Sequence, residues 1–196
     1  MLFRSFRVRA AQAGIEAGSI FTRFGELLTY TAVVSVVMLA VGAYQSDVYR
    51  SVRLAVMLDE LRERGARIVV IDTPPHSAPA INAALEVAGS AVMVTRPNPM
   101  DLRALEGTWR IVQALGKPAA AVFTQTPPGT RARALALAQA YLDRLGVSHC
   151  PTPLTNTLSF PYAQAEALSV QEREPTSKAR AEIAEVWSFL KRSAIV

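Results

Sequence analysis

Short apolar runs alternate with amphipathic segments along the chain from about residue 54 onward. In the amphipathic segments, apolar side chains recur every three or four residues, which is typical of helices with one buried face. The apolar runs are predicted to be strands at 67–72, 90–95, 119–124 and, more briefly, 147–153. Helices are predicted at 54–64, 80–88, 99–115, 130–145, 160–167 and 176–193. This alternation predicts parallel βαβ units, so we expect an α/β fold on a doubly wound parallel sheet.

Several of these predicted helices carry start and stop signals. Asn98 precedes Pro99 at the start of the third helix, where an N-cap residue and a first-turn proline are favoured. Gly65, Gly116 and Gly146 follow three of the helices, and glycine commonly ends a helix. Local sequence therefore supports the boundaries that the periodicity predicts.

Residues 1–53 have a different pattern. Their longest uncharged run, 27–46, has 20 residues, enough to cross the apolar core of a bilayer as a helix. Tyr30 and Tyr44 lie near its ends, where interfacial aromatic side chains are expected. Six of the 20 residues are Thr, Ser, Gly or Gln, which instead favours a buried strand or helix of a soluble domain. Two interpretations stay open: a cytoplasmic protein, or one held in the inner membrane by a single span at 27–46.

Composition narrows the class of protein. The 196 residues suffice for about one α/β domain, and 51% hydrophobic with 19% charged residues excludes a disordered or low-complexity chain. Cys150 is the single cysteine, which excludes an internal disulfide framework and a metal site made of several thiolates. A chain with so few cysteines is expected in a reducing compartment.

The formal charge of +5 is unevenly distributed. Of the 21 basic and 16 acidic side chains, residues 1–53 carry six and three, and residues 54–196 carry the other fifteen and thirteen. The regular alternation also begins at about residue 54. We therefore expect an atypical N-terminal segment, 1–53, followed by an α/β domain, 54–196.

The end of one predicted strand is a candidate site for chemistry. Four aliphatic residues, 68–71, are followed by Asp72. An aspartate after such a strand can hold Mg²⁺ beside a nucleotide phosphate, as in a Walker B motif. The same pattern also fits an aspartate that caps a helix or forms a turn. Because ligands bind beyond the carboxyl ends of parallel strands, the loops after residues 95, 124 and 152 are candidates as well.

A resemblance to a known family begins at this strand end, in the segment Ile71-Asp72-Thr73-Pro74-Pro75. The segment resembles the switch of the ParA/MinD family of deviant-Walker P-loop ATPases. Two later segments, 95–104 and 158–170, are similar to the family's strand–proline-loop–helix unit and to the stretch before its last helix. The resemblance covers roughly residues 54–193 and is strongest to ParA proteins of plasmid and chromosome partitioning. It implies a P-loop NTPase-like fold that uses ATP and Mg²⁺.

The resemblance implies roles for individual residues. Asp72 would be the Walker B aspartate, as a catalytic residue and as the ligand of Mg²⁺. The residues implied to contact the nucleotide are Thr73, Pro74, Pro75, Thr124, Gln125, Pro153 and Leu154. The first three would form the switch that senses the γ-phosphate, and the last two would lie near adenine.

Two positions depart from the family near the implied adenine site. Thr124 and Gln125 stand at a strand end where the family usually has an adenine-facing Asn followed by a basic residue. Ala167 stands where the family often has Gly. The first departure puts recognition of the base in question. The second places a residue with a Cβ atom after a predicted helix, where the family often has glycine.

The phosphate-binding loop of the family has no counterpart in these 196 residues. A P-loop needs closely spaced glycines whose N–H groups surround the phosphates, and lysine to balance their charge. Gly14, Gly18, Gly25 and Gly42 are widely spaced, and the first lysine of the sequence is Lys117. Tight ATP binding and hydrolysis are therefore expected to be lost or severely impaired.

Three functional hypotheses follow from the sequence. The chain is a nucleotide-dependent DNA-partitioning protein, which the resemblance implies would act as a homodimer with a partner protein that stimulates hydrolysis. Alternatively it is a non-catalytic pseudo-ATPase or a fragment, which regulates or forms a heterodimer with an intact ParA. The third is a membrane-tethered protein of unstated role.

Non-specific DNA is a candidate partner because ParA-like proteins bind it. The residues that could form a basic face for DNA phosphates are Arg131, Arg133, Lys178, Arg180, Lys191 and Arg192. The alternative is a solvated helix surface, because Glu182 and Glu185 are interspersed among the later members of this set.

Overall fold

The computed structural model describes residues 33–37, 47–63, 65–66, 68–73, 78–128 and 132–196. The chain forms two compact units, Met1–Val87 and Ala88–Val196, which are considered separately. Both units combine helices with a two-stranded parallel sheet. The chain therefore has an α/β fold with parallel strands, as the alternation of apolar and amphipathic segments predicts.

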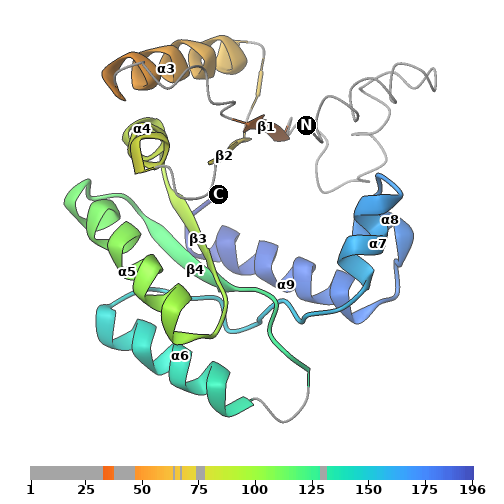
Figure 1. Ribbon diagram of the computed structural model, residues 1–196. Coiled ribbons are helices and arrows are strands. Elements are labelled where there is room, and N and C mark those ends of the chain that lie inside the picture. The colour runs from red at the N-terminus through yellow and green to blue at the C-terminus, as the bar shows by residue number, and fades with distance from the viewer. Residues whose placement is uncertain (1–32, 38–46, 64, 67, 74–77, 129–131) are drawn as a thin grey trace, which may run out of the picture. The chain divides into compact units, whose positions relative to one another are not determined.

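The first unit is a β–α–β–α arrangement. Its described elements are β1 (Val33–Val37), α3 (Asp47–Glu63), β2 (Ile68–Asp72) and α4 (Ala78–Val87) (Figure 1). β1 and β2 run parallel, with Val33 opposite Ile68 and Val37 opposite Asp72. The compositional change at residue 53 falls inside α3.

The uncharged run 27–46 contains β1. Five of its residues are extended and pair with β2, and the other residues of the run lie outside the described residues. Within the described part of the chain, no helix has the length and hydropathy required to cross a bilayer. The run therefore includes a parallel strand.

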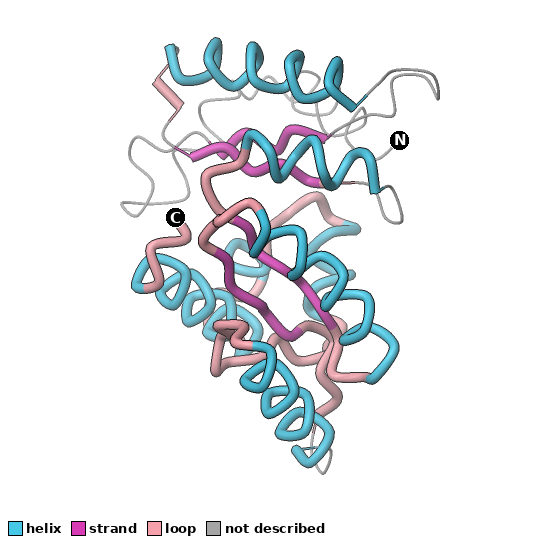
Figure 2. The backbone as a smooth tube through the Cα atoms, turned by 90° about the vertical axis from the view of Figure 1, so that its left-hand side faces the viewer, coloured by secondary structure: helices cyan, strands magenta, loops and turns pink. Residues whose placement is uncertain are grey.

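The second unit is built on β3 (Ala91–Thr95) and β4 (Ala119–Phe123), which lie side by side (Figure 2). They pair in parallel from Ala91 opposite Ala119 to Thr95 opposite Phe123. Its helices are α5 (Pro99–Ala114), α6 (Ala132–Leu145), α7 (Ser159–Ala165), α8 (Val170–Arg173) and α9 (Lys178–Arg192).

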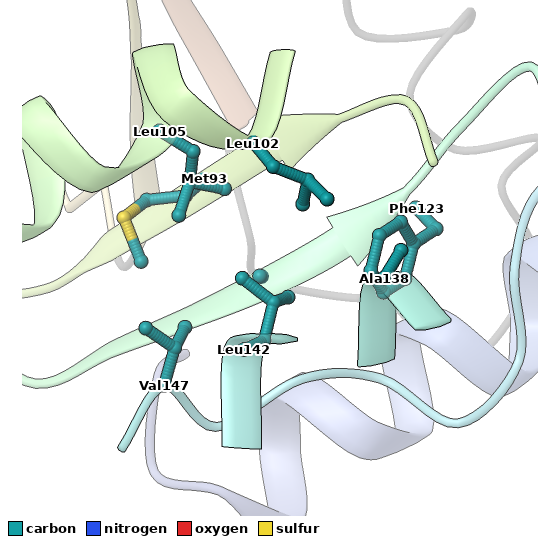
Figure 3. Packing of buried hydrophobic residues seen from close by; sticks show 8 residues of the cluster. Met93, Leu102, Leu105, Phe123, Ala138, Leu142 and Val147 are labelled. Atoms are coloured by element: carbon teal, nitrogen blue, oxygen red, sulfur yellow. The ribbon is translucent and has the colours of Figure 1, made fainter. Parts of the chain in front are cut away.

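Helices cover both faces of β4. On one face, Phe123 and Ala121 pack with side chains of α5 and α6, together with Met93 of β3 (Figure 3). The members of this cluster are Met93, Leu102, Leu105, Ala121, Phe123, Ala138, Leu142 and Val147. On the other face, Ala120 packs with Leu190 of α9 and with Ile195. Residues 120 and 121 point to opposite faces because side chains alternate along a strand.

The helix ends follow the signals in the sequence. The Asn98 side chain accepts hydrogen bonds from the backbone N–H groups of Met100 (3.1 Å) and Asp101 (3.0 Å), so it caps α5. Gly116 (φ +61°) and Gly146 (φ +71°) follow α5 and α6 in the left-handed region, where glycine lacks the steric cost of a Cβ atom. These predictions of helix start and end are confirmed.

The predicted strand at 147–153 is replaced by one isolated bridge, and a second bridge follows just beyond it. Ala121 pairs with His149, and Thr126 pairs with Thr155, both in parallel. The segment contains Pro151 and Pro153, which cannot donate backbone hydrogen bonds, so a regular ladder is interrupted. The segment nevertheless lies along β4 and its continuation.

Candidate functional site

The carboxyl end of β3 holds a polar network. The Arg96 guanidinium donates to both carboxylate oxygens of Asp101, through Nε to Oδ2 and through Nη2 to Oδ1 at 3.1 Å. Asn98 Nδ2 also donates to Asp101 Oδ2, at 2.9 Å. The hydrogen bond from Arg96 is the main cause that holds the pKa of Asp101 below its ordinary value. The network fixes the loop between β3 and α5.

The carboxyl end of β4 joins the β3 loop through the backbone. The Thr124 N–H donates to the carbonyl of Thr95 at 2.8 Å. Gln125 follows with φ +50°, a left-handed conformation that non-glycine residues seldom adopt. Such conformations gather at binding and active sites, where the surrounding structure holds them in place.

A third segment, 153–157, lies beside the continuation of β4. The Leu154 N–H donates to the carbonyl of Phe123 (2.8 Å), and its own carbonyl accepts from the N–H of Thr126 (3.1 Å). The Asn156 N–H then donates to the carbonyl of Thr126 (2.8 Å). The strand end at Thr124 and Gln125 and the segment at Pro153 and Leu154 are therefore neighbours.

Two buried polar side chains lie in this region. Thr126 is only 7% exposed, and its hydroxyl has no hydrogen-bond partner among the described residues. Glu182 of α9 is also 7% exposed, and its carboxylate accepts from the N–H (2.8 Å) and hydroxyl (2.5 Å) of Thr155. Lys178 approaches the same carboxylate at 3.4 Å from the exposed side of α9. Buried polar groups need partners, so the Thr126 hydroxyl can still accept or donate one hydrogen bond.

The chain is similar in fold to a cell division ATPase. It matches the crystal structure of Pyrococcus furiosus cell division ATPase MinD with a TM-score of 0.59 and 15% sequence identity. The match covers 72% of this chain and 58% of that chain, so this chain corresponds to somewhat more than half of MinD. No protein-family model and no curated protein matches the sequence. At 15% identity this similarity shows the fold alone.

The predicted switch belongs to the first unit. Asp72 is the last residue of β2, is exposed, and lies opposite Val37 in the register. Thr73 follows it and is half-buried, whereas Pro74 and Pro75 lie outside the described residues. The structure thus places Asp72 at the carboxyl end of β2.

The metal interpretation depends on Asp72. Among the residues that the structure describes, no group of three or more His, Cys, Asp or Glu side chains could hold a metal ion. Mg²⁺ in nucleotide sites needs only one or two carboxylates, because phosphate oxygens and water complete its octahedron. An exposed carboxylate at a strand end fits that limited role, and it does not fit a metal site made of protein ligands alone.

The predicted DNA-contacting residues that the structure describes are exposed but dispersed. Arg133 lies in the first turn of α6, and Lys178 and Arg180 lie in the first turn of α9. Lys191 and Arg192 lie in its last turn, about 20 Å from Lys178 at 1.5 Å of rise per residue. Arg131 lies outside the described residues. The members on α9 are thus divided between its two ends.

Thr126, Thr155 and Glu182 are absent from the sequence prediction of the site. Glu182 carried a signal that could have identified it, because it stands between Ala179 and Val186 on the apolar stripe of α9. A carboxylate in an apolar stripe needs a specific partner, and Thr155 supplies it. Thr126 and Thr155 carried no comparable signal, since only the pairing of the 153–157 segment with β4 brings them together.

Proposed function

We propose that this chain is a ParA-type DNA-partitioning protein that binds an adenine nucleotide at the carboxyl ends of its parallel strands. The proposal is supported by one observation above all. The end of β4 and the 153–157 segment are joined at Thr126 and Leu154, and the buried Thr126 hydroxyl has no partner among the described residues. A strand-end site of this kind is where open α/β sheets bind ligands. The fold likeness to MinD is consistent with that use.

The base end of the nucleotide is expected at Thr124, Gln125, Pro153 and Leu154. An amide side chain such as that of Gln125 can both donate to and accept from the edge of a base, and Gln125 is exposed. Pro153 and Leu154 offer apolar surface for a base to lie against. The phosphates of the nucleotide would bind Mg²⁺. In this protein Asp72 would hold the ion, and residues 73–75 would sense the γ-phosphate.

Hydrolysis is expected to be slow in this chain. Phosphoryl transfer depends on positioning and on positive charge at the phosphates, which a P-loop lysine normally supplies. The sequence has no lysine before Lys117 and no closely spaced glycine run. Nucleotide binding is therefore the activity that the proposal requires, and rapid turnover is not.

A binding titration tests this proposal. A fluorescent ATP analogue should bind the wild-type chain, more tightly with Mg²⁺, and Asp72→Ala should remove the Mg²⁺-dependent part of the affinity. Asp143→Ala is a matched control, because Asp143 is also an exposed aspartate but lies at the far end of α6. Absence of binding at millimolar nucleotide would eliminate the nucleotide-dependent function.

DNA binding is the second part of the proposal. The supporting residues are basic, exposed side chains of α6 and α9, and their contacts to phosphates would be independent of DNA sequence. Binding to random duplex DNA should fall steeply with salt. A double variant, Lys191→Ala with Arg192→Ala, should reduce the salt slope by about 2, since each lost phosphate contact lowers it by about one. An unchanged slope would exclude the last turn of α9 from the interface.

The alternative is a non-catalytic partner of an intact ParA. The absence of a glycine-rich, lysine-containing loop from the 196 residues favours it. This function predicts that the purified chain binds no nucleotide but forms a heterodimer with an intact ParA protein. Sedimentation of the mixture, with each protein alone as the control, separates the two proposals.

A further inference from the structure

The 153–157 segment is held from two sides. On one side, the backbone of Leu154 bonds to Phe123 and to Thr126 along the continuation of β4. On the other side, Thr155, the next residue, bonds to Glu182 of α9 through its N–H and its hydroxyl. Two successive residues are thus fixed to two different elements, which leaves the peptide between them little conformational freedom.

Burying a carboxylate for this purpose is costly. An ionised side chain that is 7% exposed loses most of its hydration, and it is tolerated only where hydrogen bonds and charge compensate. Here the Glu182 carboxylate accepts two hydrogen bonds from Thr155 and forms an ion pair with the ammonium of Lys178. An apolar residue at 182 would continue the stripe of α9 without that cost. The carboxylate is therefore better explained by its hydrogen bonds to Thr155 than by the packing of α9.

We infer that Glu182 is a positioning residue that strengthens binding of the base by fixing Pro153 and Leu154 beside Gln125. This inference rests on the proposed function, because it assigns a role within the nucleotide site. Glu182 itself would not touch the nucleotide. It acts through Thr155, and its loss should loosen only the part of the site that faces the base.

The test compares a ligand that carries a base with one that lacks it. Titrations of the full chain with ATP and with ribose 5′-triphosphate separate contacts to the base from contacts to ribose and phosphates. Glu182→Ala should weaken ATP binding about tenfold, which corresponds to about 1.4 kcal/mol. Binding of ribose 5′-triphosphate should change less than about twofold, because the phosphates are held elsewhere. Glu185→Ala, an exposed glutamate of the same helix, is the matched control and should leave both affinities unchanged.

Two further variants keep the test valid if Glu182→Ala does not fold. In Glu182→Gln, the amide oxygen can accept from the Thr155 N–H while its NH₂ group donates to the hydroxyl, so binding should be rescued. Thr155→Val removes only the hydroxyl and should weaken ATP binding by a smaller factor, again without affecting ribose 5′-triphosphate.

The outcomes separate this inference from the proposed function. If the wild-type chain binds ATP more tightly than ribose 5′-triphosphate and neither Glu182→Ala nor Thr155→Val changes that ratio, the role of Glu182 is wrong and the nucleotide site remains. Equal loss of both ligands would mean a purely structural role, and would also overturn the inference. If the wild-type chain binds neither ligand, the proposed function and the role of Glu182 fail together. Should Glu182→Ala not fold, the ratio in Thr155→Val decides.

Discussion

β3 and β4 are paired strands of one sheet with similarly apolar sequences, yet they are buried differently. Val92 and Val94 of β3 are 41% and 65% exposed. Their partners in the register, Ala120 and Val122 of β4, are 0% and 3% exposed. Within the second unit, α9 and the residues after it cover β4 on that face, as the contacts of Ala120 show. A continuous apolar run thus predicts a strand. Whether one or both faces of that strand are buried depends on the helices that pack against it.

The two strands also end differently. After β3, the side chains of Arg96, Asn98 and Asp101 close the loop among themselves. After β4, the backbone of Thr126 pairs with the distant 153–157 segment, and Gln125 adopts a left-handed conformation. The polar side chains after β3 are therefore satisfied within one loop. The end of β4 combines segments that are distant in the sequence, and it is the more suitable place for a ligand.

The largest effect is expected from truncating the buried face of β4. Phe123→Ala removes a fully buried ring from the cluster of α5 and α6 and should lower the free energy of unfolding by about 3–5 kcal/mol. Val94→Ala is the matched truncation on the exposed face of β3 and should cost less than about 1 kcal/mol. Urea denaturation followed by circular dichroism measures both. A Val94→Ala cost as large as a core truncation would show that this face of β3 is covered in the folded chain.

A smaller effect is expected at the end of β3. Asn98→Ala leaves the N–H groups of Met100 and Asp101 without their acceptor and should cost about 1 kcal/mol. Asn98→Ser retains an N-cap oxygen and should restore most of that loss. The same denaturation experiment measures both variants. Equal losses for Ala and Ser would mean that the cap oxygen is not what stabilises this loop.

A substitution just after β4 should increase the free energy of unfolding in the same experiment. A left-handed backbone costs a non-glycine residue about 1–2 kcal/mol, and glycine avoids this at the cost of greater entropy in the unfolded chain. Gln125→Gly should therefore raise the free energy of unfolding by roughly 0.5 kcal/mol while weakening ATP binding. Ala167→Gly, at φ +57°, is the control that should gain similar stability without affecting ATP. If Gln125→Gly binds ATP as well as the wild type, the Gln125 side chain is not a base contact.

The smallest effect is a pH dependence at the end of β3. The hydrogen bond from Arg96 holds the pKa of Asp101 below its ordinary value, so this carboxylate stabilises the fold above about pH 3.9. The contribution is lost as the pH falls through the lowered pKa of the folded state. Asp101→Asn should thus be less stable than the wild type at pH 7, and the difference should shrink below about pH 3.9. Urea midpoints at several pH values test this, with Glu185→Gln as the control. A difference that does not shrink in acid would contradict it.

Much of the fold could be predicted from the sequence because its signals are local. Asn98, Gly116 and Gly146 mark helix ends by their own backbone chemistry, and the apolar run 90–95 contains β3. The strand at 33–37 was one of two open interpretations, since an uncharged run of 20 residues suits a membrane helix as well as a buried strand. The helix α8 was not predicted, because four residues are too few to show a period.

Less of the candidate site could be predicted. Thr124, Gln125, Pro153 and Leu154 are neighbours, and their contact with a nucleotide stays a prediction. The contact of Glu182 with Thr155 spans 27 residues of sequence and has no local signature. The roles of Asp72 and of 73–75 stay predictions, because they depend on a nucleotide.

The cover of β4 also has a consequence for how the protein is made. Ile195 packs on the face of β4 at Ala120, and its carbonyl accepts a hydrogen bond from the Ser90 hydroxyl at 2.5 Å. About 75 residues separate Ala120 from Ile195, so at typical rates of translation several seconds pass between the synthesis of the strand and that of its cover. During that interval one face of the nascent sheet is apolar and unprotected. Efficient folding of this protein is therefore expected to depend on chaperones that bind the growing chain.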